Sequence, residues 1–315
     1  MKWNIYSKLW MIFFVLMGTA CTNQVGDAIP LSDQPIEFSV QSDWKEIPNT
    51  RLNAGRDHFE KDDTIQIFGF HRSSSGDSVK FMYSVKEPER GQIVVFDSTD
   101  WNYSPKRFWP KEGKLDFYAG YPHYSVLNDK TNHNKMKYKQ DVNPLQLDLL
   151  WGESPDHNCA KDSIDSTKNV VINKVEINMK HALAKVIINF DEESLGKIKQ
   201  AKVSAYYAGY FYLSETNQGI PHWIIDTTSD KYIQEATLLP WQNQPTIGDA
   251  TVFILPDKIT GLILKKDDGT EINVSDKIQK YKFDAGKVYN LTISKGVQNN
   301  TNTRSIAMSV RCVSE

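Results

Sequence analysis

The chain has 315 residues, with 37 basic and 39 acidic side chains, and its formal net charge is −2. This near balance gives no electrostatic reason to expect nucleic acid as a partner. A hydrophobic content of 40% and an aromatic content of 11% are enough for a sizeable folded core. Beyond the leader, no apolar run reaches the about 20 residues that a membrane-spanning helix needs.

Residues 1–20 have the order of a secretory leader. Two lysines precede the apolar run Leu9–Met17, which is too short to span a bilayer. Small residues then lead to Cys21, the pattern that a lipoprotein signal peptidase cleaves, although Gly18 stands where leucine or valine is usual. We therefore expect a lipoprotein signal peptide and a lipid on Cys21, which would anchor the chain without spanning the membrane. The alternative is an ordinary leader that leaves Cys21 as a thiol.

A polar tether and one strand follow the leader. Residues 21–35 are polar and turn-rich, and Ile36–Gln41 then alternates apolar and polar side chains, which predicts a half-buried strand. The segment Lys45–Arg56 is rich in proline, asparagine and glycine, so we expect an exposed loop. Arg51 and Arg56 would make this loop a substrate for a trypsin-like protease. The alternative is that both arginines are simply solvated.

Short strands separated by polar turns fill the next part of the chain. Their spacing favours an antiparallel sandwich over alternating strands and helices. The segments Asn128–Asn143 and Ser154–Asn169 are polar and are expected to be loops. The aromatic core and rim are predicted at Trp101, Phe108, Trp109, Phe117 and Tyr121. The predicted strands are Thr64–Phe70, Val79–Val85, Gln92–Asp97, Lys106–Trp109, Lys114–Tyr118 and Leu145–Trp151.

The segment Lys174–Phe190 divides the chain. Its apolar alternation shifts phase near Ala184–Lys185, which predicts a strand interrupted by a β-bulge or a very short turn. A helix is the rival interpretation, but the β-branched run Val186–Ile188 favours a strand. About 150 residues precede this segment and about 100 follow it, and each part has the size of a small β domain.

The remaining half continues in the same way. Asp267–Gly269 carries the signal of a hairpin turn between two strands. The predicted strands are Ala201–Leu213, Ala236–Trp241, Asp249–Leu255, Gly261–Lys265, Glu271–Val274 and Val288–Ile293.

Residues 297–315 form a polar linker and a last strand. A strand on a flexible linker must bury its apolar face and pair its backbone groups. It can fold back on its own domain or add to another chain, and both alternatives remain open. The apolar face consists of Ile306, Met308, Val310 and Cys312.

With Cys21 assigned to lipid, Cys159 and Cys312 are the remaining cysteines. In an oxidising compartment they are a candidate disulfide, although their spacing does not decide the matter. A disulfide between them would favour packing of the last strand on its own chain.

Catalytic and metal motifs are missing from the sequence. The seven histidines form no HExxH pair, and there is no GxSxG, GxGxxG or CxxC motif. The densest group of potential ligands lies in a polar loop, and a solvated loop is a better interpretation of it than a zinc site. We therefore expect no enzyme activity, no cofactor and no metal site. That group consists of Asp156, His157, Cys159 and Asp162.

Five sequence segments follow the leader and Arg51 in a fixed order. Together they resemble the fimbrillin family of Bacteroides-type fimbriae and the related fimbrillin-like lipoproteins. The resemblance implies an all-β chain of two tandem transthyretin-like antiparallel β-sandwich domains, residues 36–169 and 170–296, with the junction near Asn169. The segments are FEKDDTIQIFGF, KFMYSV, FWPKEGKLDFYAGYP, QLDLLWG and VEINMKHALAKVIINF.

The resemblance also implies a function. The chain would be a structural subunit or accessory of a cell-surface fimbria, or pilus, exported as a lipoprotein to the outer membrane. Cleavage after Arg51, with Arg56 as substitute, would remove the strand Ile36–Gln41, and the strand Ile306–Val313 of another subunit would fill the groove. Its partners would be other fimbrial subunits and a ligand on a host or bacterial surface.

The alternative function is a surface glycan-binding lipoprotein with tandem β-sandwich domains. Sugar rings stack on exposed aromatic faces, so this function needs an aromatic platform. Aromatic residues on strands also serve as core or as cross-strand pairs. The candidate platform consists of Tyr206, Tyr210, Tyr212 and Trp223.

Overall fold

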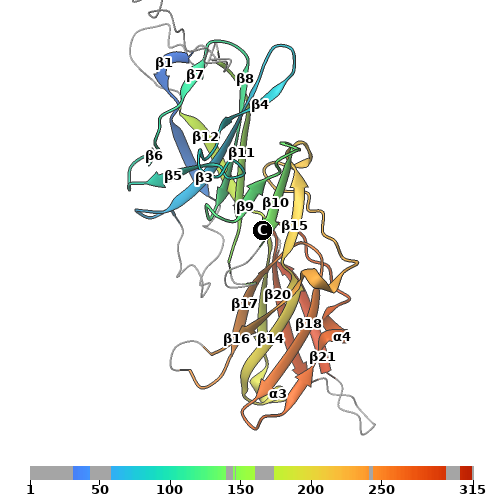
Figure 1. Ribbon diagram of the computed structural model, residues 1–315. Coiled ribbons are helices and arrows are strands. Elements are labelled where there is room, and N and C mark those ends of the chain that lie inside the picture. Colours follow the sequence, from blue (N-terminus) through green and yellow to red (C-terminus); the bar gives the residue numbers. More distant parts are fainter. Residues whose placement is uncertain are drawn as a thin grey trace, which may run out of the picture.

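The computed structural model describes residues 31–42, 58–139, 145, 147–159, 174–240, 244–295 and 306–313, with residues 31–34 and 306–313 described by their backbone alone. The predicted sites at Cys21, Arg51 and Arg56 lie outside these residues. The described chain forms two lobes built almost entirely of β-strands (Figure 1), so the all-β prediction is confirmed. The transthyretin-like topology of each domain stays a prediction.

The first lobe is organised around one large sheet. Its strand order is β2-β12-β11-β8-β3-β5-β6, and β4 is added by pairing with β3. Neighbouring strands are antiparallel except β2 and β12, which run parallel. A separate antiparallel pair joins β1 to β7. The strands are β1 (Leu31–Pro35), β2 (Phe38–Ser42), β3 (Thr64–Arg72), β4 (Ser78–Met82), β5 (Gln92–Phe96), β6 (Trp101–Asn102), β7 (Phe108–Pro110), β8 (Lys114–Tyr121), β11 (Leu150–Asn158) and β12 (Val175–His181).

Strand β3 shows why this sheet is buried on both faces. Ile65 and Ile67 point into the core of the first lobe. Phe68 and Phe70, half a period out of phase, belong to a different apolar cluster at the junction between the lobes. The continuous apolar run TIQIFGF therefore matches a strand covered on two sides.

The second lobe is a sandwich of two sheets. Their strand orders are β17-β13-β20-β21 and β16-β14-β18-β19. Alternate residues of both sheets meet in one apolar core, and Val186, Val203, Val252 and Leu291 within it are fully buried. Its strands are β13 (Ala184–Phe190), β14 (Ile198–Tyr206), β16 (Ile233–Leu238), β17 (Asp249–Ile254), β18 (Ile259–Lys266), β19 (Glu271–Asn273), β20 (Val288–Lys295) and β21 (Ile306–Val313).

The helices that fall wholly within the described ranges are single turns next to strands. These are α3 (Glu192–Leu195), α4 (Ser275–Ile278) and the 3-10 turns η2 (Leu213–Glu215) and η3 (Asp230–Tyr232). None of the described helices is long or apolar enough to cross a membrane.

A third sheet connects the lobes. Its order is β15-β10-β9, where β9 (Val126–Asn128) and β10 (Lys135–Lys139) come from the first half of the chain and β15 (Ala208–Tyr212) from the second. Figure 1 places it between the two lobes. Beneath it, Trp151 packs edge-to-face on Phe211 with ring centroids 5.1 Å apart. The lobes therefore share a buried apolar cluster, so we expect them to move as one body.

The chain crosses from one lobe to the other at Ala182–Leu183. Strand β12 pairs with β2 and β11 in the first lobe, whereas β13 pairs with β17 and β20 in the second. Strand β12 therefore belongs to the first-lobe sheet, so the described chain crosses between the lobes later than the predicted junction near Asn169. The phase shift marks a two-residue break at Ala182–Leu183, which agrees with the very short turn and not with the β-bulge, and the helix interpretation is wrong.

Two predicted loops contain strands. Within Asn128–Asn143, Met136 and Tyr138 are buried on β10 while Lys137 between them is exposed. The loop expected from Ser154 begins later, because β11 continues to Asn158 beside β8.

Candidate functional site

Strand β2 closes the edge of the first-lobe sheet. It is a five-residue strand that pairs only with β12 in the described sheet, placing Phe38 opposite Val175 and Val40 opposite Ile177. Parallel pairing is slightly less stable per residue than antiparallel pairing. Its backbone is therefore held by one short ladder, and its side chains must supply most of its attachment.

Those side chains enter the core. Ile36 is fully buried, and Phe38 and Val40 are 2% and 8% exposed. The Phe38 ring packs edge-to-face on Phe117 at 5.4 Å, and the Tyr103 hydroxyl donates to the Ile36 carbonyl at 2.7 Å. Loss of this segment would leave an apolar groove along β12 with unpaired backbone groups on its floor.

The last strand is paired within its own chain. Strand β21 lies antiparallel to β20, with Val310 opposite Leu291 and Met308 opposite Ile293. Of the two alternatives for the tail, the single chain adopts the one in which the tail folds back. Because β21 is at the edge of its sheet, its release would break one ladder and leave the rest of the sheet in place.

The cysteines of the candidate disulfide lie in different lobes. Cys159 is fully buried with the first-lobe core, and its backbone N–H donates to the Gly113 carbonyl at 3.1 Å. Cys312 lies opposite Tyr289 in the second lobe. A disulfide needs Cα atoms within about 7 Å, so this arrangement gives the pairing no support, and it stays a prediction.

The four aromatic residues of the candidate glycan platform do not form one exposed surface. The strand is interrupted at Tyr207. Tyr206 is therefore buried on β14, while Tyr210 and Tyr212 lie on β15. The Tyr210 and Tyr212 rings stand at 81° to each other. Trp223 packs on the Phe211 ring and donates from Nε1 to the Ala182 carbonyl at 2.6 Å. The platform prediction is therefore wrong.

Charged groups are buried where the chain crosses between the lobes. His181 Nδ1 lies 2.5 Å from Asp148 Oδ2. Lys185 is 2% exposed, and among the described residues its Nζ has no hydrogen-bond partner. Burial lowers the pKa of Lys185 to about 8, against a weaker opposing effect of Asp148. Burial of this lysine lowers the free energy of unfolding, and the sequence alone did not predict that burial.

In the predicted group of potential metal ligands, Asp156 forms ion pairs with basic side chains. Asp156 lies 2.5 Å from Arg72 Nη2 and 3.1 Å from Lys114 Nζ, and Asp162 is outside the described residues. Among the residues that the structure describes, no group of histidine, cysteine or carboxylate side chains could hold a metal ion.

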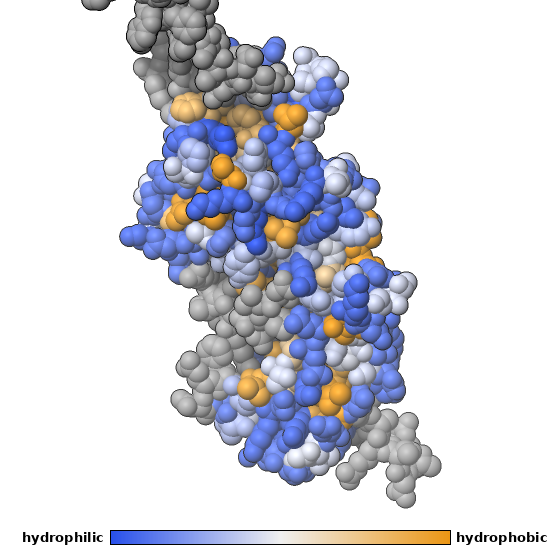
Figure 2. Space-filling model, in the orientation of Figure 1, coloured by the Kyte–Doolittle hydropathy of each residue, from blue (hydrophilic) through white to orange (hydrophobic). Residues whose placement is uncertain are grey.

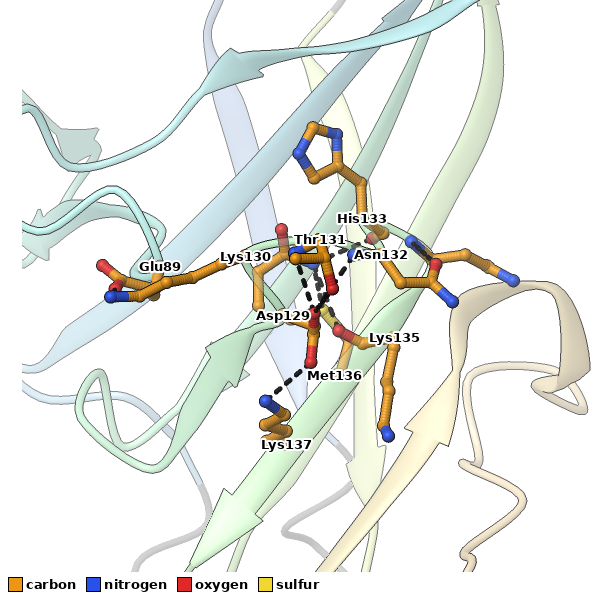
Figure 3. A network of polar contacts seen from close by, with 11 residues as sticks. Glu89, Asp129, Lys130, Thr131, Asn132, His133, Lys135, Met136 and Lys137 are labelled. Carbon is orange, nitrogen blue, oxygen red and sulfur yellow. Dashed lines mark hydrogen bonds and ion pairs between the residues drawn. The ribbon is translucent and has the colours of Figure 1, made fainter.

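A network of polar contacts shapes the surface beside β9 and β10 (Figure 3). Asp129 Oδ1 accepts hydrogen bonds from the Thr131 and Asn132 backbone N–H groups at 2.8 and 3.1 Å. Lys137 Nζ lies 2.6 Å from Asp129 Oδ2 and, together with these hydrogen bonds, lowers the pKa of Asp129 well below its ordinary value. Lys130 contacts Glu89 at 2.6 Å. The network borders a pocket. The sequence did not indicate this pocket, because the residues of the network were predicted to be solvated loop residues.

The described chain is thus all-β, with a short edge strand β2 packed on the first-lobe core and a last strand β21 at the edge of a second-lobe sheet. A family model of fimbrillin-like proteins matches residues 50–308. The chain therefore belongs to the fimbrillin-like family, and the resemblance seen in its sequence is confirmed.

Solved structures share this fold. A candidate cell adhesion protein from Bacteroides uniformis is 15% identical, with 89% of this chain and 98% of that chain covered and a TM-score of 0.52. A second, from Bacteroides ovatus, is 11% identical, with 89% and 97% covered and a TM-score of 0.51. Identities this low show the fold alone. No curated protein matches the chain.

Proposed function

We propose that this chain is a structural subunit or accessory of a cell-surface fimbria, exported as a lipoprotein, matured by proteolysis and assembled by strand exchange. The observation that carries the proposal is β2, a short edge strand whose removal would open an apolar groove along β12. Membership of the fimbrillin-like family supports the fimbrial role.

Export places the chain at the outer membrane. Cys21 carries the lipid, and the residues between Cys21 and Leu31 link the lipid to β1, with which the described first lobe begins. The precursor is then held at the surface while its first strand is still in place, so the groove stays closed before assembly.

Cleavage opens the groove. A cut after Arg51, or after Arg56 as substitute, separates β1 and β2 covalently from β3. The segment with Ile36, Phe38 and Val40 is then held by non-covalent contacts alone. Its dissociation becomes a bimolecular equilibrium, which dilution and competition by another strand shift towards release.

The strand of another subunit fills the groove. Residues Ile306, Met308, Val310 and Cys312 repeat the apolar alternation that Ile36, Phe38 and Val40 present. The incoming strand restores the ladder on β12 and re-buries apolar surface at about 25 cal/mol per Å². It must first leave β20 in its own chain, so exchange is favourable where the groove binds it better than β20 does. Other fimbrial subunits are therefore the partners, and the assembled fibre presents a surface to a host or bacterial ligand.

A truncation at the tail separates cleavage from assembly. We expect brief trypsin treatment of the leaderless chain to cut after Arg51 or Arg56 and to yield SDS-resistant multimers that disappear on heating. A variant that ends at Arg304 should be cut at the same site and remain monomeric, because it lacks the donor strand. Mass spectrometry of the fragments and an unheated gel measure both. Multimers of the truncated variant would contradict the assignment of the donor.

A further inference from the structure

A pocket lies where the first lobe meets the connecting sheet β15-β10-β9, and none of its lining residues belongs to β2 or β12. Its walls come from the loop between β4 and β5 and from the β9–β10 hairpin. The two walls are tied together, because the Asn128 backbone N–H donates to the Glu89 carbonyl at 2.7 Å. The cavity measures about 490 Å³, within the roughly 300–1,000 Å³ that is typical of small-ligand sites.

The charged groups that line the pocket are matched in pairs. Arg90 lies 2.7 Å from Glu87, Lys130 lies 2.6 Å from Glu89, and Lys137 lies 2.6 Å from Asp129. The lining therefore has no excess of either sign, and it offers no electrostatic reason to select an ion. It does present ammonium and guanidinium donors next to carboxylate acceptors, which is the combination that a group of neighbouring hydroxyls can use.

The polar side chains are held before any ligand arrives. Asp129 is fixed by the hairpin backbone and by Lys137, as Figure 3 shows, and Arg90 Nη1 donates to the Tyr124 carbonyl at 3.0 Å. Such pre-ordering reduces the conformational entropy that a ligand would otherwise have to remove on binding.

An exposed apolar side chain adjoins these charges. Leu127 lines the pocket and is 36% exposed. The face of the molecule in Figure 2 is largely hydrophilic with small, separate hydrophobic patches. A ligand that fits paired charges beside an apolar side chain must itself have a hydroxyl edge and an apolar C–H face.

We propose that this pocket binds a neutral sugar unit of a carbohydrate, one or two rings in size. The site is independent of strand exchange, so it is present in the unassembled chain as well as in a fibre. The chemistry is shared by host glycans and by bacterial polysaccharides. Because Lys137 and Lys130 lower the pKa values of Asp129 and Glu89, binding should be constant between about pH 5 and 8.

The test uses the leaderless, uncut full chain on an array of neutral, acidic and amino-sugar oligosaccharides from both sources, followed by calorimetric titration of the best neutral binder. We expect neutral sugars to bind, and Leu127→Asp to weaken binding at least about tenfold by placing an unpaired charge against the C–H face. Lys130→Met should weaken it similarly by removing a donor. The matched control is Val85→Asp, since Val85 is 69% exposed on the same β4–β5 loop and does not line the pocket.

Several outcomes would overturn the proposal. These are no binding to any neutral sugar, binding to acidic glycans alone, or binding that Leu127→Asp leaves unchanged while its melting temperature equals that of the unsubstituted chain. A preference for host or for bacterial sugars would identify the source. Because the uncut chain is used, failure here would leave the strand-exchange proposal untouched.

Discussion

Replacing Lys185 with methionine should raise the free energy of unfolding by about 2 to 3 kcal/mol at pH 7. The Lys185 side chain is buried beneath the junction, and its pKa falls to about 8 from an ordinary value of 10.5. Folding at neutral pH therefore takes a charged amine out of water without a hydrogen-bond partner among the described residues. Methionine has a similar length and no charge, so urea unfolding should show a higher midpoint at an unchanged slope.

The free energy of unfolding should also depend on pH because of Lys185. Between about pH 8 and 10.5 the folded lysine has lost its proton and the unfolded lysine has kept it. The unfolded chain then binds more protons, so this lysine makes the stability rise with pH in that window. Lys185→Met should abolish that rise. Lys202→Met is the control, because Lys202 is 40% exposed beside Glu235 and should change stability by less than about 1 kcal/mol. A less stable Lys185→Met variant would refute the account.

Phe38→Ala should destabilise the uncut chain by about 3 to 5 kcal/mol and leave the assembled fibre unaffected. The Phe38 ring is 2% exposed and packs on Phe117 and Tyr103. Its removal opens a cavity in the precursor. Under the proposed strand exchange, a donor strand replaces β2 in the fibre, so the substituted residue is absent from it.

Phe283→Ala is the matched control for this prediction. Phe283 is 1% exposed and packs edge-to-face on Tyr289 in the second lobe, at 5.0 Å. Because the second-lobe core remains in both states, this variant should weaken precursor and fibre alike. Urea unfolding of the precursor and heat dissociation of the fibre measure the two states. A fibre weakened as strongly by Phe38→Ala as by Phe283→Ala would show that β2 stays in place.

The strands themselves were largely predictable from local pattern. The alternation around Ile65 and Ile67, and the apolar run of β17, identify strands because side chains on successive residues face opposite sides of a sheet. Strand β10 was missed, although Met136 and Tyr138 alternate with lysines, because the surrounding asparagines and lysines made the segment read as a loop.

Pairing across long separations could not be predicted in the same way. Strand β12 joins the first lobe because β2 and β11 supply its neighbours, and no local pattern states which strand will lie beside another. The tyrosine platform was predicted from one continuous strand, which the break at Tyr207 divides between two sheets. The pocket could not be predicted, because Glu89 and Lys130 are distant in the sequence and form an ion pair only in the folded chain.

The most direct test of strand exchange uses two complementary chains. The donor carries Arg51→Ala and Arg56→Ala, so it keeps its own first strand and its tail. The acceptor ends at Arg304 and is treated with trypsin, so its first strand is held by non-covalent contacts alone and it has no tail. We predict that each is monomeric alone and that mixing yields a one-to-one, heat-sensitive dimer. Monomers that stay separate after mixing would contradict strand exchange as the means of assembly.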